Sequence, residues 1–398
     1  MVKGGKNMTK VRELAEKYHD YVVTMRREFH ENPEPSLKEV RTCKRICEEL
    51  EKMGIPYKVV AGTGVVGTIK GAKPGKTVAL RGDIDALTVK EVNDIPYKSK
   101  VEGIMHACGH DAHAAGLLGA GKILNELKGE LCGEVRLLFQ PAEETADGAK
   151  AMIKDGCLEG VDSALGIHVW SGLPLGKVSI EAGPRTAAAG IFQFKVTGKG
   201  GHGAMPNGGV DAGVAAASIL LNLQSIVSRE LSPMLPTTVT VGKIVAGTRW
   251  NVLASEAVLD GTVRTFSRET QDNLKGIMER IIKDTASAYR CTADWLDYRM
   301  ITTPCINPEH AHKVAAGALT KCFGEQSIGD FEMQMGGEDF CYMMEAVPDS
   351  LLAFVGVANP DKLADKPHHA GNFMIDEDGL LYSVCLYAQY AMDYTAGA

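Results

Sequence analysis

The chain lacks several features that would place it in a particular class at once. It has no basic block, and 43 Lys and Arg against 50 Asp and Glu give a formal net charge of -7, which argues against nucleic acid as the main partner. No apolar run approaches a membrane span, and residues 1–6 lack the apolar region of a secretory signal. We therefore expect a cytoplasmic protein with no membrane partner, starting at either Met1 or Met8.

The ten cysteines also lack the dense spacing of a secreted disulfide scaffold. We expect reduced thiols that serve mostly as small core residues. Cys43 and Cys47 lie four apart on a helical pattern with no histidine nearby. Only Cys108 has neighbours of the kind that bind metals.

At 398 residues the chain is long enough for two domains. Residues 8–53 are predicted to be helical, apart from a proline-broken loop at 29–35 that carries His30. Strand and helix patterns then alternate, with strands predicted at 63–70, 77–81, 134–139 and 163–169. This order predicts an α/β fold with a mostly parallel sheet covered by helices on both faces.

The pattern changes near residue 183 to strand-helix-strand-strand-helix-strand, which is the ferredoxin-like order. The strands are predicted at 191–197, 237–245, 257–266 and 292–300, and the helices at 211–228 and 271–288. An α/β pattern then resumes, with a helix over 308–322 that Asn307 would cap. We expect a discontinuous catalytic domain, 1–183 and 301–398, with an α+β domain inserted at 184–300.

The stretch Met105-His106-Ala107-Cys108-Gly109-His110-Asp111-Ala112-His113 is rich in groups that bind metals or move protons. A cysteine and a histidine two apart, just ahead of an apolar helical pattern, favour a metal site. A turn with a buried thiol and a few polar caps is the alternative.

Acidic and histidine side chains follow other predicted strands at the point where each strand ends. In a parallel sheet these ends share one crevice, so we expect the following residues to converge there: Asp83, Asp85, Glu143, Glu144 and His168. Taken alone, the two glutamates are better explained as acids at a helix start. Beside a thiolate and imidazoles they suit zinc or a similar ion, one as a ligand and the other as the base for a water that the metal acidifies.

The inserted domain adds a glycine-rich loop at 198–206 that holds His202. A flexible turn is the simpler explanation, and a histidine that hydrogen-bonds a developing oxyanion is the alternative. Asn251 and Arg264 also lie in this domain, and an arginine can bind a carboxylate through two parallel hydrogen bonds. Ordinary surface polarity would equally account for them.

Several motifs together resemble the M20 metallopeptidase family. They are Arg81-Gly82-Asp83-Ile84-Asp85-Ala86-Leu87, the stretch 105–113, Phe139-Gln140-Pro141-Ala142-Glu143-Glu144, Gly200-Gly201-His202-Gly203-Ala204-Met205-Pro206, Asn251, Gly261-Thr262-Val263-Arg264-Thr265-Phe266, Gly337-Glu338-Asp339-Phe340, and His369 with Phe373. More narrowly, they resemble its M20D amidohydrolase branch of hippurate hydrolases, N-acyl-amino-acid amidohydrolases and auxin-conjugate hydrolases. The resemblance runs in order over nearly the whole chain.

The resemblance implies a role for each matching residue. The implied ligands of two divalent metal ions, manganese or zinc with nickel or cobalt as alternatives, are Cys108, His110, Glu144, His168 and His369. Glu143 would be the general base, and Asp85 would orient the metal site. His202 would stabilise the oxyanion, in many relatives across a dimer, and Asn251 and Arg264 would hold the substrate carboxylate. His106, Asp111 and His113 would be supporting groups.

This sequence departs from the family pattern at two places. It has His368 and His369 where one histidine is usual, and the four-residue gap to Phe373 favours His369. Thr88 replaces a common proline. Neither departure removes an implied ligand.

The implied reaction is metal-dependent hydrolysis of an N-acyl amino acid to a carboxylic acid and a free amino acid, in a homodimer or homotetramer whose inserted domain serves as lid and dimerisation domain. A dipeptidase or aminopeptidase of the same family is the nearest alternative. A metal-binding protein without catalysis and a zinc-stabilised structural protein are more distant ones. The acyl group and the amino acid stay open.

Overall fold

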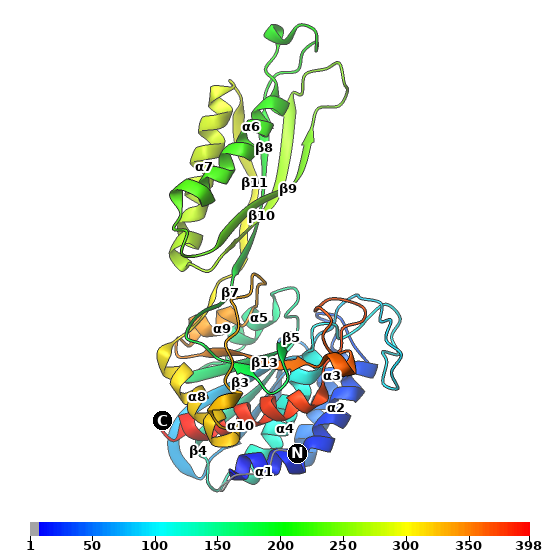
Figure 1. Ribbon diagram of the computed structural model, residues 1–398, viewed down its shortest axis with the longest axis vertical. Helices are drawn as coiled ribbons and strands as arrows, with labels where there is room; N and C mark the ends of the chain where they lie inside the picture. The colour runs from blue at the N-terminus through cyan, green and yellow to red at the C-terminus, as the bar shows by residue number, and fades with distance from the viewer. Residues whose placement is uncertain (1–7) are drawn as a thin grey trace. The chain divides into compact units, whose positions relative to one another are not determined.

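The computed structural model describes residues 8–398, so the alternative start at Met1 lies outside the described residues. Their contacts divide them into two units, each described here by itself (Figure 1). The first unit comprises residues up to 183, 306–332 and 339–398. The second comprises 184–305 and 333–338, so it also takes in 301–305 and 333–338, which we expected in the catalytic domain.

The first unit is built on a seven-stranded sheet in the order β1-β2-β4-β3-β5-β13-β6. Its central strands β4, β3, β5 and β13 run parallel, whereas β1, β2 and β6 join by antiparallel pairing. This confirms the predicted α/β class. The bounds are β1 (Tyr57–Val60), β2 (Gly64–Lys70), β3 (Lys73–Asp83), β4 (Cys132–Gln140), β5 (Ser163–Pro174), β6 (Val178–Ser179) and β13 (Leu351–Ala358).

Helices α4 (His110–Glu126) and α10 (Leu380–Thr395) pack against each other and against β3. Gly121 lets α4 approach the sheet, because a Cβ there would lie 2.5 Å from a Leu137 methyl carbon. Gly82 does the same for the first turn of α4, because a Cβ there would lie 2.9 Å from the His113 carbonyl oxygen. The remaining helices are α1 (Lys10–Lys17), α2 (His19–Glu31), α3 (Val40–Met53), α5 (Gly148–Lys154), α8 (Glu309–Phe323) and α9 (Cys341–Ala346).

Two local expectations in this unit were wrong. His30 lies in α2 and not in a loop, because the helix continues to Glu31 before the two prolines. Asn307 does not cap α8: its side chain instead bonds the Leu352 backbone on both sides, at 2.8 and 2.9 Å. The Asn307 side chain thus bonds the backbone of β13 and not the first turn of α8, as the local sequence had indicated.

The second unit is a four-stranded antiparallel sheet in the order β11-β8-β10-β9, with α6 packed against α7 and against the sheet. This is the predicted ferredoxin-like topology. The bounds are β8 (Ala188–Thr197), α6 (Ala212–Ser225), β9 (Thr237–Ala246), β10 (Glu256–Thr265), α7 (Arg268–Ala288) and β11 (Thr292–Thr302). The short strands β7 (Gly183–Thr186) and β12 (Cys305–Asn307) pair with each other.

The expectation that no apolar run approaches a membrane span was wrong for α6. With the π-helical turn after it, residues Ala212–Glu230 form a helix long and apolar enough to cross a membrane, by length and composition alone. Its apolar composition has a local use, because Ala212, Ala215, Ala216, Ile219 and Leu223 are buried in the core of the second unit. The helix therefore fits the role of a core helix.

Candidate metal centre

The site begins at the sharp turn that opens α4. Gly109 has φ +92°, and a Cβ there would lie 2.4 Å from a methyl carbon of Val169, so only glycine fits this turn. The turn separates Cys108 from His110, the first residue of the helix. Cys108 Sγ lies 3.4 Å from His168 Nε2, and His168 lies inside β5, which continues to Pro174, and not at its end as expected. The expected convergence of these three residues is therefore present.

Cys108 belongs to two groups of three donor atoms that lie within 4.8 Å of one another. One group adds His110 and Glu144, and the other adds His168 and His368. His110 Nε2 and Glu144 Oε1 face each other at 3.8 Å, and both are buried without a hydrogen-bond partner among the described residues. Two ligands of one ion, each ~2.1 Å from it, lie ~3–4 Å apart. These orphaned atoms fit a divalent metal.

Asp85 organises this part of the site. Its carboxylate accepts hydrogen bonds from Ser36 Oγ at 2.7 Å and from the backbone N–H groups of Glu143 and Glu144 at 3.1 and 3.2 Å. It also lies 3.2 Å from His110 Nδ1. A proton on that nitrogen leaves Nε2 free as a ligand. Burial would raise the pKa of Asp85, but the bond with His110 outweighs it and the pKa is lowered.

Glu143 and Glu144 sit on a tight turn after β4, with left-handed backbone at Ala142 (φ +52°) and Ala146 (φ +57°). The buried Glu39 holds this turn by accepting the Ala142 N–H at 2.9 Å. Glu143 Oε1 accepts the Asp339 N–H at 3.3 Å. The turn thus points two adjacent carboxylates in different directions, one toward His110 and one toward Asp339.

Burial favours the uncharged forms of several donor groups in this centre. Burial raises the pKa of the Cys108 thiol and of the Glu144 carboxyl, and burial lowers the pKa of His168. Burial would also lower the pKa of His110, but Asp83 and Asp85 raise it. Bound divalent charge inverts this balance, because it stabilises thiolate, carboxylate and neutral imidazole together.

The two adjacent histidines near the C-terminus lie differently. His369, with φ +63°, places Nε2 3.6 Å from Glu144 Oε1 and leaves 56 % of its side chain exposed. The His368 ring packs at a tilt against the Trp170 ring, with centroids 4.5 Å apart, and its Nε2 accepts the Ser171 N–H at 3.3 Å. The structure therefore brings His369 to Glu144, and His368 to Cys108 and His168.

The supporting groups expected from the sequence are buried behind the ligand candidates. His113 Nδ1 lies 2.5 Å from Asp83 Oδ1, and its Nε2 accepts the Val169 N–H at 2.8 Å. This bond holds the middle of β5, next to His168. Both nitrogens of His106 are buried without a partner among the described residues, and burial lowers its pKa to about 4. His106 is therefore an uncharged neighbour of the centre.

In the second unit, His202 and Asn251 lie together. His202 forms a β-bridge with Val252, and the Gly203 N–H donates to the Asn251 carbonyl at 2.9 Å. Both residues flank the end of β10 that starts at Glu256. A hollow of 660 Å³ beside them is lined by Gly203 and by residues 246–250, among others.

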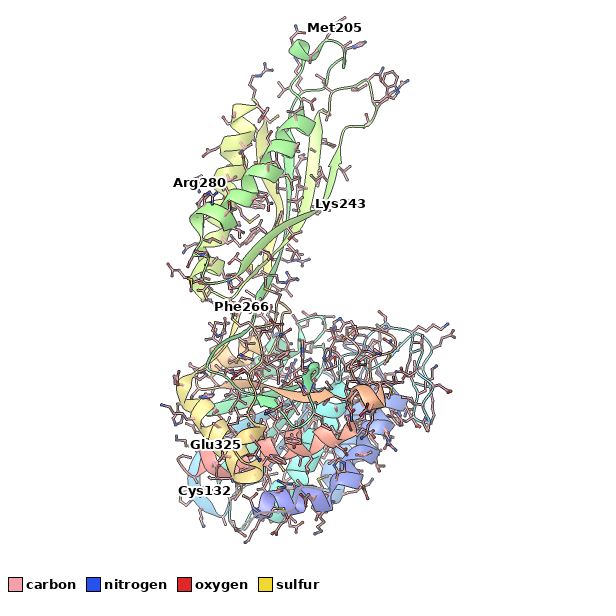
Figure 2. All side chains as sticks on the ribbon, viewed as in Figure 1. Cys132, Met205, Lys243, Phe266, Arg280 and Glu325 are labelled. Atoms are coloured by element: carbon pink, nitrogen blue, oxygen red, sulfur yellow. The ribbon has the colours of Figure 1, made fainter. Side chains whose placement is uncertain are left out.

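Arg264 is at the other end of β10. An antiparallel strand rises ~3.4 Å per residue, so Arg264 lies ~27 Å along the strand from Glu256. Figure 2 shows Met205 and Phe266 at opposite ends of this unit. Asn251 and Arg264 of one copy are therefore too far apart to hold the same carboxylate, and their expected role in substrate binding stays a prediction. Burial lowers the pKa of Arg264, which bonds Thr262 Oγ1 and the Val263 carbonyl.

Some residues that position the proposed ligands and the base were not predicted from the sequence. Arg81 is fully buried, 2.8 Å from Asp83, from Asp339 and from the Gln140 side chain. An arginine inside an apolar strand was a readable signal, because a buried guanidinium needs acids around it. Glu39 and Ser36 gave no such signal, because they precede an ordinary helical pattern.

With this geometry in view, comparison with known proteins decides the family. The family model described as "Peptidase family M20/M25/M40" matches residues 79–393. The chain belongs to this family. The M20 match includes all five proposed metal ligands and parts of both units. It confirms the family resemblance that the motifs indicated.

Two M20 relatives show the kind of bond that is cleaved. The chain is 40% identical over 381 residues to "IAA-amino acid hydrolase ILR1-like 4" of Arabidopsis thaliana, covering 95% of this chain and 86% of the relative. It is 37% identical over 379 residues to "N-acetylcysteine deacetylase" of Bacillus subtilis (strain 168), covering 94% and 97%. The chain is accordingly a hydrolase of amide bonds.

A solved M20 structure extends the comparison to the fold. A Bacillus subtilis protein described as "a Dinuclear Metal Binding Peptidase from M20 Family" matches with a TM-score of 0.85 and 32% identity. The match covers 96% of this chain and all of the other. The chain thus has the fold of a solved M20 protein as well as the sequence motifs of the family.

Proposed function

We propose that this M20 protein is a two-metal amidohydrolase that cleaves N-acyl amino acids to a carboxylic acid and a free amino acid. The observation that carries the proposal is that Cys108 is shared by two donor groups, with unpaired atoms on His110 and Glu144. The names of two relatives, an IAA-amino acid hydrolase and an N-acetylcysteine deacetylase, support this substrate class.

The proposed ligands are Cys108, His110, Glu144, His168 and His369. Two divalent ions held there would polarise the scissile carbonyl and lower the pKa of the attacking water. Manganese or zinc suits this donor set, and nickel and cobalt are alternatives. Asp85 keeps His110 in the tautomer that exposes Nε2, so metal affinity depends on it as well.

Glu143 is the proposed general base. Its backbone is fixed by Asp85 and its Oε1 by the Asp339 N–H, so the carboxylate is held beside the ligand Glu144. It takes a proton from the attacking water and delivers it to the leaving nitrogen. A carboxylate that performs both transfers must keep its place throughout, which these two backbone contacts ensure.

We further propose that each complete site uses two copies of the chain. Arg264 would hold the substrate carboxylate in one copy, while His202, as oxyanion donor, and Asn251 would come from the partner, since β10 separates them from Arg264 of their own chain. Helix α6 and edge strand β9 offer a surface for such a homodimer or homotetramer, because Val214, Leu221, Ile244 and Val245 are exposed there. The second unit would then serve as lid and dimerisation domain of a cytoplasmic enzyme.

The test is a hydrolysis panel run on metal-free enzyme reloaded with manganese, zinc, nickel or cobalt. N-acetyl, N-benzoyl and long-chain N-acyl amino acids are compared with dipeptides, and the released amino acid is measured. We expect the N-acyl amino acids to be cleaved with higher kcat/KM than any dipeptide. Cleavage of dipeptides alone would favour a peptidase, the alternative that a 37% identical "Thermostable carboxypeptidase 2" of Saccharolobus solfataricus supports.

A further inference from the structure

His30 is a buried histidine that the proposed reaction does not use. It lies on α2, and both of its ring nitrogens face carboxylates. Nδ1 is 2.7 Å from Asp111 Oδ2, and Nε2 is 3.2 Å from Glu91 Oε1. All three side chains are almost completely buried.

This arrangement is satisfied only by a doubly protonated ring. A neutral imidazole has one N–H, so it could donate to either Asp111 or Glu91 but would turn a lone pair toward the other carboxylate. Burial and the Arg26 guanidinium, 3.4 Å from Nδ1, would lower the pKa of His30. The two carboxylates outweigh them and raise the pKa.

The charges around His30 come from several segments. Arg26, on the same helix, lies 2.9 Å from Asp111 and 3.3 Å from Glu377. The Tyr97 ring packs edge-on against the imidazole at 5.8 Å, and His106 is an uncharged neighbour. Asp111 and Glu91 also accept the backbone N–H groups of Ala112 and Ser99, so a neutral His30 would leave neither acid without a donor, but it would turn a lone pair toward one buried carboxylate oxygen.

The carboxylates connect His30 to two of the segments that carry proposed ligands. Asp111 directly follows His110 at the start of α4. Glu91 accepts the side-chain amide of Asn93 at 3.1 Å, and the same amide donates to the Phe373 carbonyl at 3.1 Å. The Val92 N–H donates to the Gly371 carbonyl at 2.8 Å, which holds the loop after His369.

We propose that His30 is a positioning residue, whose protonated imidazole ties the turn bearing Cys108 and His110 to the loop bearing His369. The inference rests on the proposed ligand set, because it supplies the reason for joining these segments. Without the tie, each ligand still exists, but the ions must order the two segments when they bind. Removal of His30 therefore weakens metal binding in a folded protein.

The experiment compares His30→Gln with His312→Gln. His312 is a matched control, because it is a half-buried helical histidine whose Nδ1 bonds the Ile180 carbonyl, at 2.9 Å, and no carboxylate among residues 8–398. Zinc affinity is measured by competition with a chromogenic chelator, at a temperature where circular dichroism shows each variant folded. We expect at least ~10-fold weaker zinc binding for His30→Gln, the size found when groups behind metal ligands are removed, and no change for His312→Gln. Unchanged affinity in folded His30→Gln would overturn the proposal.

A second arm separates positioning from general stability. Glu91→Gln is made alone and together with His30→Gln. If the two residues act through one tie, the double variant binds zinc about as weakly as His30→Gln alone. Additive losses would overturn the proposal, as would a His30 ring that nitrogen NMR shows to be neutral at pH 7. Zinc binding by a wild-type protein that hydrolyses no amide would refute the proposed function and leave this inference standing.

Discussion

The two units prepare their functional groups in opposite ways. In the first, Asp85, His110 and Glu143 are held by neighbours, and the atoms left without partners are inside the centre. In the second, His202 is exposed and Arg264 has no carboxylate partner among residues 8–398. The proposed catalytic groups of the first unit are therefore fixed in place by other residues, whereas those of the second unit are free to contact a substrate. If this difference is correct, substitutions in the two units should affect turnover and metal binding differently.

The largest effect should come from Glu143→Gln. Loss of a general base costs up to ~10⁴-fold in kcat, while both metal ions should stay bound because Glu143 is not a proposed ligand. Turnover of an N-acyl amino acid and metal content by mass spectrometry are the two measurements. The matched control is Glu130→Gln, a surface acid paired with Lys10. Near-normal turnover with metal bound would show that Glu143 is not the base.

His202→Ala should follow, with kcat lowered ~10²–10³-fold, the usual loss of one oxyanion donor. Metal content and the melting temperature should hardly change, because the histidine is exposed in the second unit. Steady-state kinetics and metal analysis together check this. A loss of metal in this variant would contradict the proposal that the first unit alone binds the metal ions.

The sequence alone predicted the α/β order, the ferredoxin-like insert and the acidic residues at strand ends, whereas His168 lies inside β5 and not at its end. It could do so because strand ends in a parallel sheet share one edge, whatever the loops do. It could not place Asn251 relative to Arg264, because their separation depends on which end of β10 each loop meets. His30 was also misplaced in a loop, because α2 continues to Glu31, and its partners Asp111 and Glu91 are distant along the chain. Nor could residue spacing show that His368 also reaches Cys108.

Asp85→Asn should have a smaller effect, centred on metal affinity. The amide can still accept from Ser36 but no longer enforces the His110 tautomer, so metal binding should weaken ~10–100-fold. Chelator competition measures it, and Asp260→Asn, on the sheet of the second unit, is the control. Equal affinities for the two variants would argue against an orienting role.

The smallest effect should be that of metal removal on the fold. Ions at ~100–1,000 times their Kd stabilise by ~3–4 kcal/mol, so chelation should lower the melting temperature by a few degrees without unfolding the chain. Hydrogen exchange should rise at residues 105–113 and stay constant in β8 and β10. Global unfolding on chelation would instead indicate a structural metal protein.

The length of β10 has a consequence for genetics. If Arg264 and His202 act on one substrate only from different copies, a gene damaged at Glu143 and another damaged at His202 are not equivalent losses. In a cell that carries both alleles, some dimers would contain one undamaged site, with Glu143 from one product and His202 from the other. Two null alleles would then complement each other, and a single strand of ten residues would be the reason.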